Sequence, residues 1–234
     1  AGCAVANGGW WFAGSGWVQP PSLCAASLEA AGGRLRGHFG HTVARLGYDG
    51  GAWHAHGPDG STIASAPVAI LAPGTGIADF EQASLPVVSA RGQVSHLPAV
   101  AGSAPRVVVC RGGYVSPAVD GLRCAGATFA VDDPDPGLRP QDHAENLQRL
   151  EAMIPGFGAG LGAGFDPDRL DGRVGFRPAS PDRLPMVGAL PLPDRPPASA
   201  ARGLDELPRR PGLYALSGYG ARGLVWSGVA AQLL

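Results

Sequence analysis

The spacing of hydrophobic residues along this chain predicts many short strands and three helices. The clearest helix lies within residues 139–156, where four apolar positions fall on one face before a Pro-Gly pair: Leu147, Leu150, Met153 and Ile154. A second helix is predicted to begin at Pro20 and to end at Gly32. Proline lacks an N–H and suits a helix start, because the first N–H groups of a helix have no internal partner. An apolar helix is also predicted for residues 222–234.

Two groups of strands are expected between these helices. Residues 41–72 form a meander with turns at 48–51 and 58–60, and its last apolar run, 66–72, is typical of a strand buried on both faces of a sheet. The second group lies within residues 85–131, with a hairpin turn at Asp120-Gly121. We also expect the first residues to contribute a strand, and residues 212–218 to form one directly before the last helix. The pattern predicts a mixed α/β (α+β) fold.

Composition narrows the possible functions only moderately. Hydrophobic residues make up 45% of the 234 residues and charged residues 16%, which is enough apolar material for a substantial core. The net charge of −1 gives no nucleic-acid footprint over the whole chain, although a local basic patch remains open. No apolar run reaches the roughly 18 residues of a membrane span. The spacing of the four cysteines favours free thiols in a reducing, cytoplasmic setting over a metal site.

Several glycine-rich and proline-rich stretches need an explanation. The segment SGYGARGL holds a G-x-G-x-x-G at Gly218, Gly220 and Gly223, after a predicted strand and before a predicted helix. A complete dinucleotide fingerprint also needs a second strand and an acidic residue about 20 positions on, and neither follows. These glycines therefore either allow close strand–helix packing or aim a helix N-terminus at an electron-rich ligand edge. Residues 156–165 are predicted to be a loop and residues 190–212 a surface excursion.

Other stretches decide between these interpretations. They are GSGWVQPPSLCAASL, RGQVSHLP, VVVCRGGYVSPAVDGLRCAGATF, GRVGFRPASPDRLPMVG and LYALSGYGARGL, spread over nearly the whole chain. With these motifs the chain resembles the FAD-dependent amine oxidases of the D-amino-acid and glycine oxidase type. Within them it is most similar to the oxidase half of the bifunctional enzymes that build 5-methylaminomethyl-2-thiouridine in tRNA.

The resemblance implies an incomplete FAD-binding, Rossmann-like domain at residues 16–80 and 171–234. A mostly antiparallel substrate-binding sheet at 1–15 and 81–170 would interleave with it. The family's opening strand–GxGxxG–helix unit and the methyltransferase half are expected upstream of Ala1. We therefore expect this chain to bind FAD weakly or not at all.

The resemblance also implies roles for residues that face the substrate. Arg177 would bind a substrate carboxylate through its planar guanidinium; the alternative is a structural ion pair with Asp182 or Asp171. Tyr114 would line the substrate face of the flavin, or else be a core tyrosine. His96 is only a weak candidate base, because these oxidases need no catalytic residue beyond the flavin. Arg91, in the same motif as His96, would either orient RNA or hold a domain interface.

The flavin contacts implied by the resemblance lie mostly in the backbone. Val43 would lie on a strand that meets the adenine, and Gly74 would end a buried strand close to the cofactor. The remaining positions surround the terminal glycine motif: Gly218, Gly220, Arg222, Gly223 and Leu224.

The implied activity is oxidation of a C–N bond. The parent enzyme would remove the carboxymethyl group of 5-carboxymethylaminomethyl-2-thiouridine at the tRNA wobble position and release glyoxylate. Its partners would be tRNA and the methyltransferase half of the same polypeptide, with no membrane, and the sequence does not indicate an oligomeric state. The alternatives are a small-molecule glycine or D-amino-acid oxidase and a non-catalytic fragment unable to hold FAD.

Overall fold

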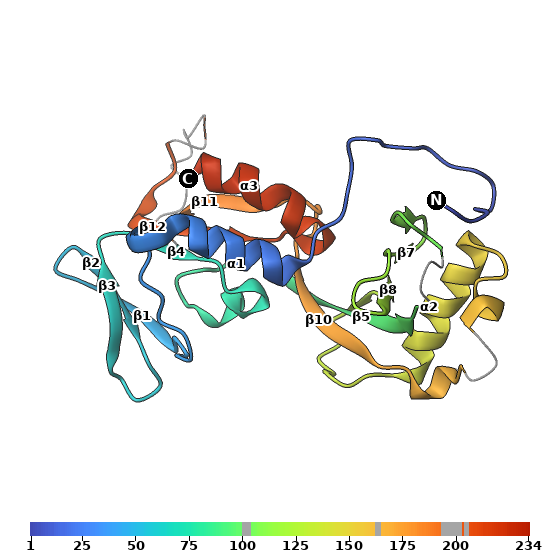
Figure 1. The fold of residues 1–234 in the computed structure, drawn as a ribbon. Coiled ribbons are helices and arrows are strands. Elements are labelled where there is room, and N and C mark those ends of the chain that lie inside the picture. Colours follow the sequence, from blue (N-terminus) through green and yellow to red (C-terminus); the bar gives the residue numbers. More distant parts are fainter. Residues whose placement is uncertain (100–103, 162–164, 193–202, 204–205) are drawn as a thin grey trace. The chain divides into compact units, whose positions relative to one another are not determined.

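The chain folds into two compact units, each built from two separate stretches of sequence. The computed structural model describes residues 1–99, 104–161, 165–192, 203 and 206–234. The first unit contains Ala1–Leu23 and Ala90–Phe176, and the second contains Cys24–Ser89 and Arg177–Leu234 (Figure 1). The assignment of a substrate-binding role to the first unit and an FAD-binding role to the second stays a prediction, as do the domain boundaries at residues 16, 80 and 171.

A six-stranded sheet forms the framework of the first unit. Its strands follow the order β10-β5-β8-β7-β6, with β9 also paired to β5. The bounds are β5 Val88–Pro98, β6 Val109–Cys110, β7 Tyr114–Val115, β8 Leu122–Gly126, β9 Ala130–Val131 and β10 Gly172–Ala179. β5, β6, β7, β8 and β9 pair antiparallel, as the resemblance implies for a substrate sheet. Asp120 and Gly121 both have positive φ, 51° and 78°, so the predicted hairpin turn is confirmed.

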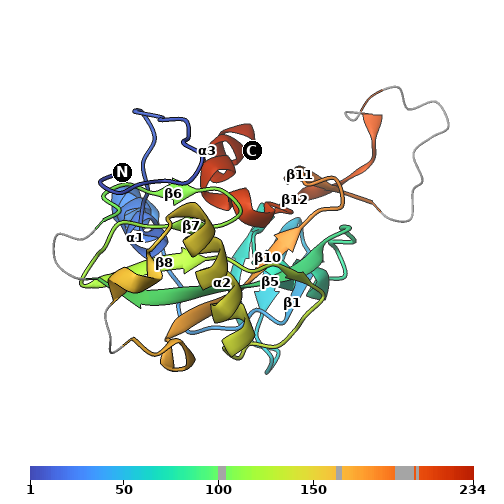
Figure 2. The same ribbon diagram turned by 90° about the vertical axis from the view of Figure 1, so that its right-hand side faces the viewer.

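Helix α2 (Pro140–Met153) packs against β8 and covers one face of this sheet (Figure 2). Pro140 occupies the first helical turn, where a missing N–H costs no hydrogen bond. The predicted apolar face is confirmed: Leu150, Met153 and Ile154 are buried in a core with Leu97, Val115 and Ala125. Two short 3₁₀ helices, Gly158–Leu161 and Pro167–Arg169, follow α2.

The second unit contains two three-stranded sheets. The predicted meander forms β1 (Arg45–Asp49), β2 (Ala52–His56) and β3 (Thr62–Ala66), all antiparallel. In the other sheet, β12 (Arg209–Ser217) lies between antiparallel β11 (Met186–Pro191) and parallel β4 (Ala69–Leu71). Short 3₁₀ helices cover Gly32–Arg34, Gly74–Asp79 and Gly220–Arg222. Leu71, Leu213 and Ala215 of the second sheet share a core with Leu46 and Trp53 of the first.

Two expectations about strands are wrong. The run 66–72 is not buried on both faces: β4 has three residues at the edge of its sheet, and Ile70 is 52% exposed while Leu71 is buried. Residues 1–19, all of them described, contain no strand. Instead, isolated backbone hydrogen bonds hold the first residues. Ala6 N–H donates to Met153 O at 2.9 Å, and Arg106 N–H donates to Ala1 O at 2.9 Å. The predictions for 156–165 and 190–212 fall partly outside the described residues.

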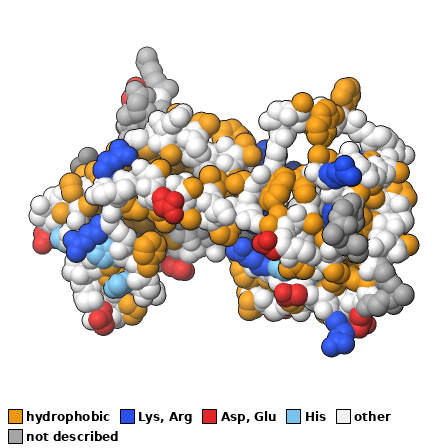
Figure 3. All heavy atoms as spheres, viewed as in Figure 1, with side chains coloured by type: hydrophobic (Ala, Val, Ile, Leu, Met, Phe, Trp, Pro, Cys, Tyr) orange, Lys and Arg blue, Asp and Glu red, His pale blue; other side chains and the backbone are white. Residues whose placement is uncertain are grey.

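Both remaining helices match their predicted positions, yet they bury almost nothing. Helix α1 (Pro20–Ala31) has no buried residue, and α3 (Gly223–Leu233) buries only Ala230. Hydrophobic side chains consequently reach the surface, as the orange atoms in Figure 3 show. In the described part of the chain no helix is long and apolar enough to cross a membrane. All four cysteines are free thiols.

Candidate functional site

The parallel strands β12 and β4 bring two of the predicted glycine sites to the same edge of a sheet. Ala215 of β12 lies opposite Leu71 of β4, so the segments that follow these two strands leave the sheet side by side. β4 leads to Gly74, and β12 ends at Ser217, directly before the glycine motif. Ligands of open α/β sheets bind outside the carboxyl ends of such strands.

Backbone conformation explains why glycine occupies three positions at this edge. Gly218, Gly220 and Gly74 have φ values of 75°, 53° and 66°, a region that other residues adopt only with strain. A Cβ at Gly218 would also lie 3.0 Å from Met186 Cε, whereas a Cβ at Gly220 or Gly74 would meet nothing within 4 Å. Gly218 is therefore required by the turn and by packing, and the open sides of Gly220 and Gly74 leave their backbones accessible.

The turn leads into α3 without a side-chain cap. Neither Tyr219, which precedes the short 3₁₀ helix, nor Arg222, which precedes α3, makes a side-chain capping bond. The first N–H groups of a helix lack internal partners and carry partial positive charge. Gly223 and Leu224 are the first two residues of α3, and both Leu224 and Arg222 are exposed.

One buried polar atom next to the turn has no partner. Within the described residues, Ser217 Oγ is buried and makes no hydrogen bond, although such groups are nearly always paired. An unpaired hydroxyl, an uncapped helix start and accessible glycine backbones form a set of donors. This donor set fits the electron-rich N1–C2=O edge of a flavin.

Val43 does not occupy the strand expected for it. Pairing with β2 begins at Arg45, opposite His56, so Val43 lies two residues before β1. It is 37% exposed. The expected strand position is therefore wrong because the meander starts later, and the adenine contact stays a prediction.

The two residues predicted to face the substrate lie on two strands of the six-stranded sheet. Arg177 is half-buried on β10, and Tyr114 is half-buried on β7, opposite Cys110 and Gly126. The carboxylates considered as partners of Arg177 have other contacts: Asp182 accepts a bond from Leu184 N–H at 3.0 Å, and Asp171 one from Gly172 N–H at 2.7 Å. The substrate roles of Arg177 and Tyr114 stay predictions.

His96 has an acidic neighbour on its own unit. Its Nδ1 lies 3.7 Å from Asp171 Oδ2, and its backbone N–H donates to Asp171 O at 2.9 Å. The side chain is 26% exposed. Asp171 is thus placed to orient the imidazole, and nothing in this contact requires a role in chemistry.

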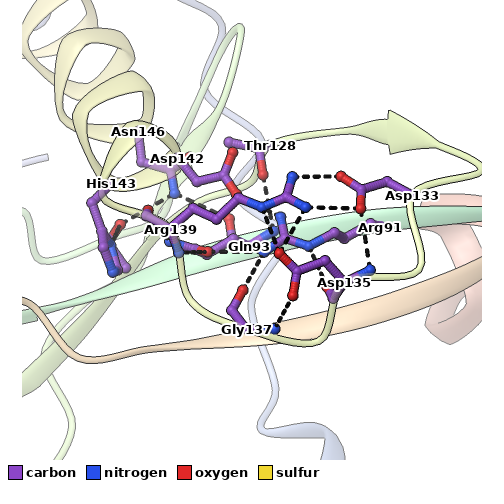
Figure 4. A network of polar contacts seen from close by, with 11 residues as sticks. Arg91, Gln93, Thr128, Asp133, Asp135, Gly137, Arg139, Asp142, His143 and Asn146 are labelled. Carbon is purple, nitrogen blue, oxygen red and sulfur yellow. Dashed lines mark hydrogen bonds and ion pairs between the residues drawn. The ribbon is translucent and has the colours of Figure 1, made fainter.

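Arg91 is the centre of a buried polar network (Figure 4). Only 1% of its side chain is exposed, and its guanidinium donates to Asp142 Oδ2 at 2.5 Å, Gly137 O at 2.5 Å and Asp135 O at 2.6 Å. Such a buried side chain cannot reach RNA. All these partners belong to the first unit, so the contacts tie the segment 135–142 to β5. Neither role expected for Arg91 accounts for these contacts.

The rest of this network was not predicted. Gln93, buried on β5, makes two hydrogen bonds to the backbone of Arg139. Its amide oxygen accepts from Arg139 N–H at 2.9 Å, and its amide nitrogen donates to Arg139 O at 2.9 Å. Ser95 and His143 share a bond of 2.8 Å, and Asn146 donates to Gln93 O at 3.0 Å. A signal exists in the sequence, because polar residues at 91, 93 and 95 of a strand must share one face.

Electrostatics follows from these contacts. Arg139 forms ion pairs with Asp133 at 2.5 Å and Asp135 at 2.8 Å. The hydrogen bonds from Arg139 lower the pKa of Asp133, and the bond from Gly137 N–H is the main cause of the lowered pKa of Asp135. Burial lowers the pKa of His143, an effect that Asp142 and Asp171 partly oppose. The unpaired His143 Nε2 is consistent with a neutral imidazole.

Comparison with known proteins identifies the family. The family described as "FAD dependent oxidoreductase" matches residues 3–234. The chain belongs to this family. It is 62% identical over 234 residues to the "tRNA 5-methylaminomethyl-2-thiouridine biosynthesis bifunctional protein MnmC" of Azoarcus sp. (strain BH72), covering 100% of this chain and 36% of that protein. The protein of the same name in Aromatoleum aromaticum is 57% identical over 218 residues, 93% of this chain and 33% of that one.

Solved structures support the same fold. Iminodiacetate oxidase from Chelativorans sp. BNC1 aligns with a TM-score of 0.59 and 26% identity, over 81% of this chain and 47% of that one. Glycine oxidase from Geobacillus kaustophilus aligns with a TM-score of 0.61 and 20% identity, over 82% and 46%. The expected α/β fold of the D-amino-acid oxidase type is confirmed. The chain spans about a third of the length of the curated relatives it matches.

Proposed function

We propose that this chain is the oxidase part of a longer enzyme acting on tRNA. That enzyme oxidises the C–N bond of 5-carboxymethylaminomethyl-2-thiouridine at the wobble position and removes the carboxymethyl group as glyoxylate. The observation that carries this proposal is the 62% identity over the whole chain with a bifunctional protein of that biosynthesis. The small-molecule alternative rests on a weaker likeness, 26% identity with iminodiacetate oxidase.

The edge formed by Gly74 and the terminal glycine motif would hold the flavin. When bound, FAD supplies the two-electron acceptor for the C–N bond. The N–H groups at the start of α3 would stabilise negative charge on the electron-rich edge of the ring. Gly218 and Gly220 would keep side chains away from that edge, and the buried, unpaired hydroxyl of Ser217, directly before Gly218, would be a further donor.

Arg177 would bind the carboxylate of the carboxymethyl group. A guanidinium binds a carboxylate through two parallel hydrogen bonds, which fixes both distance and orientation. Tyr114 would add a hydroxyl donor or an aromatic face. We assign no residue as a catalytic base, and the proposed reaction requires none from His96.

We expect the chain by itself to hold FAD weakly or not at all. The terminal motif offers backbone donors for the ring edge, but the sequence of these 234 residues does not hold a complete dinucleotide fingerprint. The test is a titration of the purified chain with FAD, monitored by flavin absorbance and fluorescence after gel filtration. A stoichiometric yellow chain would contradict the expectation of weak binding.

The activity itself is tested with the longer protein and tRNA that carries the carboxymethylaminomethyl group. The expected products are glyoxylate, measured with an aldehyde-trapping reagent, and tRNA with an aminomethyl group, measured by nucleoside mass spectrometry. Arg177→Met should raise KM by about tenfold or more, whereas Arg173→Met, at an exposed arginine of the same strand, should leave it unchanged. Unaltered tRNA in the presence of FAD would overturn the proposed function.

A further inference from the structure

The N-terminal segment presents an unusual cluster of exposed aromatic rings. Trp10 is 93% exposed, Trp11 69% and Phe12 70%, and these three residues are consecutive. Large aromatic side chains at a surface generally mark a binding site, because leaving them in water forgoes their burial. The orange atoms at the upper right of Figure 3 lie over this segment.

Two cavities lie along the three aromatic residues. One, of about 590 Å³, is lined by all three with Val107, Cys110 and Arg111, among others. The second, of about 350 Å³, is lined by all three with Trp17, Arg106 and Val108, among others. The cavities and the segment belong to the first unit. The aromatic rings therefore border hollows large enough to hold flat groups.

The charged side chains that line these two cavities are basic. Among the described residues that line the two cavities, the charged side chains are Arg106 and Arg111, and there is no carboxylate. Both arginines are exposed, although the whole chain carries a net charge of −1. One Arg111 nitrogen donates to Ala6 O at 2.9 Å and to Gly8 O at 3.1 Å, which holds the segment next to this cation.

We propose that Trp10, Trp11 and Phe12, with Arg106 and Arg111, form a docking surface for the unpaired bases of a tRNA anticodon loop. Aromatic rings stack on splayed bases, and arginines beside them contact the phosphates. The absence of acidic lining residues from the described cavities matches the charge of RNA. This inference rests on the proposed function and adds to it the surface that recognises the loop.

The test measures RNA binding without turnover. A fluorescent RNA hairpin with a seven-base loop and no modified base is titrated with the full chain, without FAD, and anisotropy is recorded. Replacing Trp10, Trp11 and Phe12 together by alanine should weaken binding by about tenfold or more, since stacking contributes strongly per base. The matched control is Phe39→Ala, another exposed aromatic residue, which should bind as the wild type does. Circular dichroism verifies that each variant keeps its fold.

Salt dependence tests the arginines separately. Arg106→Gln should reduce the slope of log K against log salt concentration by about one phosphate contact, and Arg36→Gln, an exposed arginine of the second unit, should leave the slope unchanged. Equal binding of a perfect duplex and the hairpin would overturn the role of unpaired bases.

Two further outcomes would also overturn the docking surface. One is wild-type RNA affinity in the triple variant. The other is a wild-type dimer that becomes a monomer in the triple variant, which would make a second copy of the chain the occupant. Because the assay contains no FAD and no substrate group, a failure of glyoxylate release with loop binding intact would count against the proposed function alone.

Discussion

The Arg91 network of the first unit and the glycine turn of the second differ in how completely they are packed. Arg91, Gln93 and Asn146 are each at most 1% exposed, and each makes several hydrogen bonds within its unit. The turn at Gly218 leads instead to α3, where Ala230 alone is buried and Val225 is 80% exposed.

We expect this difference to separate scaffold from recognition surface. A buried charge is tolerated only when its partners are present, and Arg91 has such partners within its own unit. Uncapped helix N–H groups and apolar side chains in water are stabilised only when a ligand or another protein segment binds to them. Substitutions should therefore unfold the first region and leave the second folded but altered in what it binds.

The largest effect is expected for Arg91→Met. It leaves Asp142 and two carbonyl groups without their donor, and breaking a buried pair costs about 3–5 kcal/mol of unfolding free energy. Urea denaturation followed by circular dichroism measures the loss. Arg139→Gln, at a half-exposed arginine, is the comparison and should cost much less. Equal stability of Arg91→Met and wild type would remove the scaffold assignment.

Two glycines of one turn provide a smaller, graded test. Gly218→Ala combines a strained φ of 75° with a 3.0 Å contact to Met186, and Gly220→Ala has only the strained φ of 53°. A left-handed alanine costs about 1–2 kcal/mol, so Gly218→Ala should lose more stability than Gly220→Ala. Thermal denaturation of both variants measures the order. The reverse order would mean that the backbone of this turn relaxes around the new methyl group.

The free energy of unfolding should depend on pH through the protonation of His143. Burial lowers its folded pKa below the ordinary value of 6.5, so the unfolded chain binds the proton more readily. The neutral imidazole thus contributes stability above about pH 6.5 that is lost as pH falls toward the folded pKa. His143→Gln should flatten this slope between pH 7.5 and 5, and the exposed His41→Gln controls for loss of an imidazole. The lowered pKa values of Asp133 and Asp135 act below pH 4, in a separate window.

The smallest effect is expected on α3. Val225→Ser removes an 80% exposed side chain and should change the unfolding free energy by no more than about 0.5 kcal/mol. Leu150→Ala on α2, 1% exposed, is the contrasting variant and should cost about 2–5 kcal/mol. Val225→Ser should reduce binding of a hydrophobic dye, which Leu150→Ala should not. A large loss of stability in Val225→Ser would show that α3 is packed more tightly than its exposure indicates.

Periodicity predicted the helices well because each carries its own local signals. Pro20 and Gly32 bound α1, and four apolar positions define α2. The buried strand expected at 66–72 failed for a different reason: an apolar run does not reveal whether both faces of a sheet are covered. Ile70 lies on an edge strand and remains exposed.

For the candidate site, residue types and their local spacing were enough to predict the available chemistry and the family. The glycine motif at 218–223, Arg177 and the matching stretches are local features, and they predict an FAD-dependent oxidoreductase. Which of these residues meet became clear from the three-dimensional arrangement of the strands. It placed Gly74 beside the terminal glycine turn through a parallel strand pair, and it buried Arg91 among partners 44 to 51 residues away in sequence. Such contacts depend on strand pairing between distant segments, which residue spacing along the chain does not encode.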